Sequence, residues 1–164
     1  MVVVGKGGAV ALIDESVEAA REHGSGIVMT NKLIQRAFAA LAQDDARLAA
    51  ALFTESLSRS REYNVSRSVL GSIAGLAGVG LALDQPEAAA RLLGAVEAAS
   101  RVSGAGRYSE AALAAGIVAA VRTRLGNEAF EARKSEGSAM TYEEAIDAAL
   151  ALGGMASANQ APGA

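Results

Sequence analysis

Apolar side chains recur three or four positions apart along most of this chain, which is the spacing of one face of an α-helix. Leu113, Ile117 and Val121 are one example, at i, i+4 and i+8. A second cue is a capping box, in which Thr141 opens a helix and the Glu144 side chain reaches back to it. The pattern therefore predicts a succession of helices.

Turn-forming residues divide this pattern into segments. The strongest breaks are His23-Gly24-Ser25-Gly26, Asp44-Asp45, Ser103-Gly104-Ala105-Gly106 and Gly126, with a looser link at Tyr63-Asn64. Residues 153–164 are rich in Gly, Ala, Ser, Asn and Pro and are predicted to be a flexible tail, which leaves one helical domain over 1–152. The predicted helices are about 9–22, 27–43, 46–61, 66–83, 86–102, 108–125, 127–135 and 141–152.

An internal repeat of 40 residues joins these segments into pairs. When 36–56 is laid over 76–96, equivalent small, apolar and acidic positions coincide: Ala37 with Ala77, Leu41 with Leu81, Asp44 with Asp84, Ala49 with Ala89 and Leu52 with Leu92. Each copy predicts a helix, an acidic turn and a second helix. Stacked hairpins of this kind form a solenoid. We therefore predict an all-α fold, a right-handed α-solenoid of antiparallel helical hairpins.

Composition strengthens the helical prediction and narrows the partners. Of 164 residues, 39 are alanine, the best helix former, and only two are proline. The net charge of −3 and the lack of a long basic run argue against direct nucleic-acid binding. The uncharged apolar stretch 68–83 is too short and too rich in glycine for a membrane span. With no cysteine, a reducing cytoplasm is the expected location.

The repeat units resemble tetratricopeptide repeats. Ala49-x3-Phe53-x2-Ser56 and Ala89-x3-Leu93-x2-Val96 are similar to the small, large, small pattern of the second helix of that repeat. The chain departs from the family in its period of 40 instead of 34, in its few aromatic residues and in Arg36, which occupies a position that is normally apolar.

Two further stretches, 90–98 and 125–150, resemble the C-terminal end of large bacterial regulators. Those proteins join a signal-transduction ATPase of the maltose-regulator type to a tetratricopeptide-like sensor region, often with a LuxR-type helix-turn-helix. The resemblance covers about 16–152 and implies a detached or excised sensor end. Because the sequence has no P-loop, the ATP binding and DNA binding of those regulators are not carried over.

Few residues offer chemistry. Gly5-Lys6-Gly7-Gly8 is the only hint of a phosphate loop, and it lacks the GxxxxGK[ST] spacing. His23 is the only histidine, and its place at a helix end favours an interaction with terminal carbonyls over catalysis. Two pairs of acidic residues lie one helical turn apart: Asp14 with Glu18, and Glu143 with Asp147. Such a pair can bind a hard cation, but we favour the interpretation that these residues belong to solvated helix faces.

Two other residue sets have a plain explanation and a sharper one. Arginines flank helix ends, where they complement the helix dipole or alternatively clamp an acidic peptide: Arg59, Arg61, Arg67, Arg101 and Arg107. Four glycines lie along one apolar helix: Gly71, Gly75, Gly78 and Gly80. They permit close helix packing or, alternatively, line a ligand pocket. We assign no catalytic, metal or cofactor residue from the sequence and leave the binding residues open.

The predicted function is a non-catalytic protein-interaction or sensor module that binds a protein or peptide. The alternative is a small-molecule sensor with an effector pocket between helices. A homodimer is also expected, because 1–4 are Met1-Val2-Val3-Val4 and the first helix carries an apolar set that would lack a preceding repeat: Val10, Leu12, Ile13 and Val17.

Overall fold

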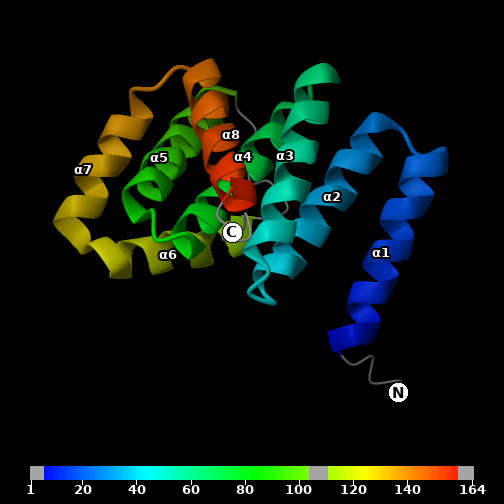
Figure 1. Ribbon diagram of the computed structural model, residues 1–164. Coiled ribbons are helices and arrows are strands. Elements are labelled where there is room, and N and C mark those ends of the chain that lie inside the picture. The colour runs from blue at the N-terminus through cyan, green and yellow to red at the C-terminus, as the bar shows by residue number, and fades with distance from the viewer. Residues whose placement is uncertain (1–5, 104–110, 159–164) are drawn as a thin grey trace.

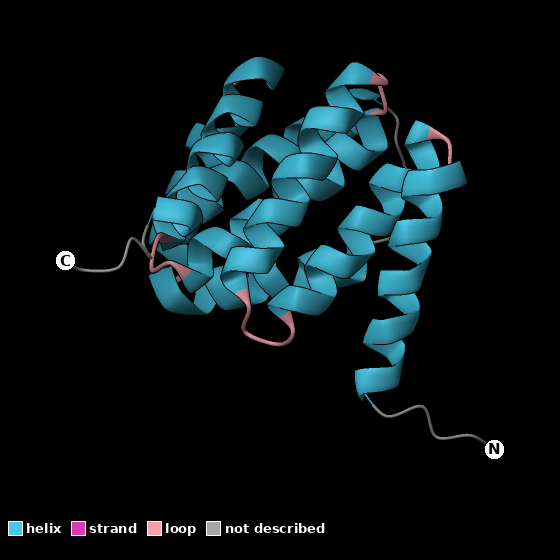
Figure 2. Cartoon of the chain, turned by 45° about the vertical axis from the view of Figure 1, so that its right-hand side comes forward, coloured by secondary structure: helices cyan, strands magenta, loops and turns pink. Residues whose placement is uncertain are grey.

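The computed structural model describes residues 6–103 and 111–158, and within these ranges the chain is helical and contains no strand (Figures 1 and 2). The all-α prediction is confirmed. Short turns join most of the helices. The helices are α1 Lys6–His23, α2 Gly26–Leu41, α3 Ala46–Glu62, α4 Ser66–Ala82, α5 Pro86–Ser103, α6 Ala111–Leu125, α7 Asn127–Ser138 and α8 Tyr142–Ala158.

The helix boundaries follow the local cues of the sequence. Those of α2 to α5 lie within two residues of the prediction, which is the normal scatter at helix ends. The capping box forms as predicted: the Thr141 N–H donates to a Glu144 carboxylate oxygen at 2.7 Å, and the Glu144 N–H donates to Thr141 Oγ1 at 3.2 Å. Because the carboxylate accepts that backbone hydrogen bond, the pKa of Glu144 is lowered.

The last helix corrects the predicted tail. α8 continues past Leu152 to Ala158, so the domain boundary at 152 is wrong for 153–158. Gly153 is buried, and a Cβ there would press on the hydroxyl of Thr54 in α3. This glycine permits a close helix contact and does not end the helix. Residues 159–164 of the predicted tail lie outside the described residues.

Three successive turns share one geometry at a spacing of 20 residues. In each, one Asp or Asn has a positive φ, and the next residue donates its N–H to a carbonyl five positions earlier. Asp and Asn tolerate this left-handed conformation better than other side chains. The link at Tyr63-Asn64 is therefore as tight as the other two, not looser. The φ values are 59° at Asp44, 56° at Asn64 and 59° at Asp84.

α4 is the central helix of the molecule. Every residue from Ser68 to Gly80 is buried, and α4 contacts α2, α3, α5, α6 and α8. α8 lies against α3 and α4, although both helices are far from α8 in the sequence. The last helix therefore folds back over the middle helices of the molecule (Figure 1). The fold therefore contains contacts between helices far apart in the sequence in addition to those between neighbouring helices.

Glycines let these helices approach closely, as predicted for α4. A Cβ at Gly75 would enter the Phe53 ring of α3, and one at Gly78 would lie 2.9 Å from Leu41 and from Ile117. Ala49 and Ala89, which lie 40 residues apart, are both completely buried.

The first helix is better covered than the sequence suggests. α1 contacts α2, and Val17 is buried while Ile13 packs against the core. Leu12 is the exception, with 60% of its surface exposed. The prediction that the apolar face of the first helix lacks a partner is therefore wrong for most of the helix, because α2 covers that face.

Candidate functional site

A buried network of hydroxyl groups joins α2, α3 and α4. The hydroxyls of Thr30 and Ser68 lie 3.2 Å apart, and those of Ser56 and Ser72 lie 3.1 Å apart. Ser60 donates to the Ser56 carbonyl at 2.7 Å. The network consists of hydroxyls, helix carbonyls and the amide oxygen of Asn31, so it holds no base that would activate a nucleophile. We assign it a structural role. The only sequence cue was serine pairs four residues apart.

The residues singled out for phosphate and acid–base chemistry do not converge. Lys6, Gly7 and Gly8 form the first turn of α1, and Gly5 lies outside the described residues. His23 is the last residue of α1; its side chain is exposed, and its Nε2 lies 3.5 Å from a carboxylate oxygen of Glu22. It therefore lies at the helix end where a positive charge is favoured.

The predicted acid pairs are engaged by different cations. Asp14 pairs with Arg36, Glu18 with Arg21 at 2.8 Å, and Glu143 with Arg61 at 2.8 Å. Asp147 is exposed. In the described part of the chain, no three His, Cys, Asp or Glu side chains come together to hold a metal ion.

The predicted arginines are dispersed in the same way. Arg59 pairs with Glu55 of its own helix at 3.0 Å, Arg61 with Glu143 of α8, and Arg101 with Glu97. Arg67 is exposed, and Arg107 lies outside the described residues. These pairs support helix ends and helix contacts, and they form no common clamp for an acidic peptide.

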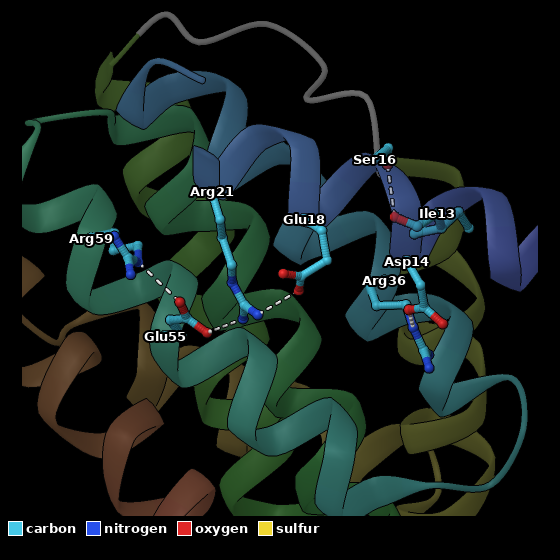
Figure 3. A network of polar contacts seen from close by, with 8 residues as sticks. All are labelled: Ile13, Asp14, Ser16, Glu18, Arg21, Arg36, Glu55 and Arg59. Carbon is cyan, nitrogen blue, oxygen red and sulfur yellow. Dashed lines mark hydrogen bonds and ion pairs between the residues drawn. The ribbon is translucent and has the colours of Figure 1, made fainter. Parts of the chain in front are cut away.

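Ion pairs tie α1 to the rest of the molecule (Figure 3). Arg21 lies between Glu18 and Glu55, with 3.3 Å to the latter, while Asp14 binds Arg36 of α2. Only 13% of the Arg36 side chain is exposed, and its Nη1 is buried without a hydrogen-bond partner among the described residues. The hydrogen-bonding capacity of this arginine is thus only partly satisfied.

A second set of ion pairs joins α5 and α7. Lys134 lies 2.6 Å from Glu97, and its hydrogen bond lowers the pKa of that carboxyl group. Arg91 lies 2.9 Å from Glu136 and lowers the pKa of Glu136 by its hydrogen bond. The backbones of α5 and α7 approach closely here, because a Cβ at Gly94 would meet the Lys134 backbone and one at Gly137 the Arg91 backbone. Both ion pairs lie beside this close contact and reinforce it.

The clearest candidate surface is an apolar groove between α2, α4 and α6, with a volume of about 350 Å³. Its lining contains no charged side chain among the described residues. Phe38 is held in its wall by an edge-to-face contact with Phe53, with the ring centroids 5.0 Å apart. We call this surface the α2/α4/α6 groove. It is lined by Phe38, Leu41, Ala42, Gly78, Leu81, Ala82, Leu113, Gly116, Ile117 and Ala120.

The groove follows the sequence repeat. Its α2 residues 38, 41 and 42 and its α4 residues 78, 81 and 82 are equivalent positions, 40 residues apart. The same face of two successive repeats therefore lines one surface, and α6 closes it. Leu113 is 53% exposed at the rim, so the groove presents apolar surface to solvent.

Sequence reasoning left the binding residues open because these positions look like ordinary core. Leu41 and Leu81 have the spacing of any buried helix face, and only the placement of α6 shows that they border an open groove. The equivalence of the two repeats was the one available cue.

Comparison of the chain with protein-family models, with curated proteins and with solved structures gave no match.

Proposed function

We propose that this protein is a non-catalytic interaction module that binds a protein or peptide in the α2/α4/α6 groove. The observation that carries the proposal is the lining of the groove by equivalent positions of two successive repeats. Repeat proteins use surfaces of this kind, built from the same face of each unit, to hold extended partners.

The chemistry of the groove defines the partner. An uncharged apolar lining favours a segment that inserts apolar side chains, such as the apolar face of a helix or an extended apolar peptide. Several residues of the groove wall are small, which leaves room for large side chains of the partner: Gly78, Ala82, Gly116 and Ala120. The partner's contacts would be aliphatic or aromatic anchors, with charges kept to the rim.

The broader assignment rests on the repeat. We propose a right-handed tetratricopeptide-like solenoid, in which α2–α3 and α4–α5 are two repeats and α8 is a covering helix. The resemblance of 90–98 and 125–150 to the sensor end of bacterial regulators suggests a role in signalling. The absence of cysteine supports a cytoplasmic location. None of the described helices is long and apolar enough to span a membrane.

Selection from a displayed random-peptide library tests the proposal. We expect enriched peptides to carry two or more apolar anchors at helical or alternating spacing. Leu113→Glu and Ala120→Glu place a charge in the groove at exposed positions of α6. Because burying an unpaired charge is costly, each should weaken the selected peptide at least about tenfold, which corresponds to about 1.4 kcal/mol.

Ala119→Glu is the matched control, since Ala119 is exposed on the same helix but does not line the groove. It should leave the affinity within about twofold, a change well under 1.4 kcal/mol. Equal affinity for all three variants and the parent would show that the peptide binds elsewhere, and the groove assignment would be abandoned.

We also propose that two copies associate through α1, through a smaller apolar surface than the sequence suggested. Leu12 is the exposed apolar residue of that helix. Sedimentation at micromolar concentration should show a dimer that Leu12→Glu dissociates. Ile13→Glu is less informative, because Ile13 packs against the core of its own chain. A monomeric parent protein across that range would contradict self-association.

A further inference from the structure

A second hollow lies on a different side of α4. Its walls come from the first half of α4, the second half of α5, the turn after α7 and the start of α8, and its volume is about 360 Å³. We call it the α4/α5/α8 cavity. Its size falls within the range of small-molecule sites in proteins. It shares no lining residue with the α2/α4/α6 groove.

The inner wall of the cavity is apolar and firmly held. Leu70, Ile73 and Ala145 line it, and their exposed fractions are 2%, 1% and 4%. These side chains belong to the core of the protein and would not collapse inward to fill the space. Apolar cavities of this kind hold water poorly and accept apolar molecules.

Polar groups of the cavity are hydroxyls and backbone, with no charge among the described lining residues. An ionised ligand would lose its hydration without gaining a counter-charge. Tyr142 lines the mouth and is 43% exposed. Partial burial raises the pKa of its phenol, so the group stays protonated and available as a hydrogen-bond donor.

One ion pair lies next to Tyr142. Glu143 follows Tyr142 in α8, and its carboxylate lies 2.8 Å from Arg61 at the end of α3. This ion pair therefore adds no net charge beside Tyr142. Together, the apolar wall, the uncharged lining and the single aromatic hydroxyl define the ligand.

We propose that the α4/α5/α8 cavity binds a small, neutral, largely apolar molecule with one hydrogen-bond acceptor, which accepts a hydrogen bond from the Tyr142 hydroxyl. This site is independent of the proposed peptide groove. It would make the module responsive to such a molecule, because bound ligand would bridge α8 to α4 and α5.

Three naphthalene probes of similar size test this chemistry: 2-acetylnaphthalene, 2-ethylnaphthalene and 2-naphthoate. Titration should show saturable binding of the neutral ketone, at least about tenfold tighter than the carboxylate. Tyr142→Phe should weaken the ketone about three- to tenfold and leave the ethyl compound unchanged, because only the ketone accepts the hydrogen bond. A carboxylate that binds as well as the ketone would overturn the proposal.

Ala99→Phe locates the site, because Ala99 is a half-buried residue of the cavity wall and a phenyl ring there would occupy the space. The matched control is Ala119→Phe on the exposed face of α6. Ala99→Phe should abolish ketone binding while Ala119→Phe retains it, with circular dichroism melting used to check that both fold. If Ala99→Phe fails to fold, the Tyr142→Phe comparison decides alone.

The Leu113→Glu variant distinguishes ligand binding in the α4/α5/α8 cavity from peptide binding in the α2/α4/α6 groove. It should weaken the selected peptide and leave ketone binding unchanged, since Leu113 lines only the groove. Ketone binding that survives in Ala99→Phe, or is lost in Leu113→Glu, would place the ligand outside the α4/α5/α8 cavity and contradict the inference.

Discussion

Arg36 of α2 places a mostly buried positive charge next to α1, where it pairs with Asp14. Its stem is buried between α1 and α2, and its guanidinium group binds Asp14 while Nη1 has no partner in the described structure. A buried donor without an acceptor costs about 1–3 kcal/mol. The ion pair with Asp14, which is 53% exposed, offsets only part of that cost.

Replacement of Arg36 by methionine should therefore leave stability unchanged or raise it. Methionine keeps the length of the buried stem and removes the unpaired donor. Asp14→Ala should instead lower the free energy of unfolding by about 1 kcal/mol, because it leaves the half-buried cation without its partner. Urea unfolding of both variants measures this asymmetry. A larger loss for Arg36→Met than for Asp14→Ala would show that the pair, not the hydrocarbon stem, holds α1 in place.

At the level of single residues, the sequence predicts burial better than it predicts polar contacts. Ala49 and Ala89 were placed correctly, because the repeat fixes which small positions face a neighbouring helix. The buried hydroxyls of Ser56 and Ser72 were missed, because serine occurs as readily on an exposed helix face. The ion pair of Arg36 was missed as well, since its partner lies 22 residues away.

At the level of elements, glycine in the middle of a helix marks contact between two helix backbones. α5 and α7 cross at Gly94 and Gly137. A Cβ at Gly94 would collide with the carbonyl group of Lys134, and one at Gly137 with the carbonyl group of Arg91. The two glycines are reciprocal, so each helix presents its bare backbone to the other.

Alanine at Gly94 or Gly137 should destabilise the protein, although alanine normally favours a helix. The added methyl group would meet backbone, which cannot rotate away, and overpacking of this kind costs about 1–3 kcal/mol or more. Gly154→Ala in α8 is the matched control, because a Cβ there meets nothing within 4 Å. It should stabilise by about 0.5–1 kcal/mol. Thermal unfolding that gave the same sign for Gly94→Ala and Gly154→Ala would contradict the crossing.

The same ambiguity of glycine explains where element prediction succeeds and fails. Gly126 with φ 83° does end α6, as predicted. Gly153 has the same local appearance in the sequence, yet α8 runs through it because Thr54 of α3 lies against it. Local residues alone do not distinguish a glycine that ends a helix from one that touches a distant helix. The neighbouring helix decides.

At the level of the whole molecule, the 40-residue repeat marked the helices and turns of α2 to α5, but it gave no information on how α6 to α8 pack. Equivalent turns at Asp44 and Asp84 fix the hairpins through nearby contacts. The return of α8 to α3 and α4 depends on contacts between residues far apart in the sequence, such as Gly80 with Leu152. The two candidate binding surfaces arise from these late helices, since α6 closes the groove and α8 closes the cavity.

The most direct test of the groove is to map a bound peptide on the protein. A peptide obtained by library selection would be titrated into ¹⁵N-labelled protein while the backbone amide shifts are followed. We expect the largest shifts at 38–42, 78–82 and 113–120, the three segments that line the α2/α4/α6 groove. Shifts concentrated on α1, or around the α4/α5/α8 cavity, with these three segments unchanged, would contradict the proposed function.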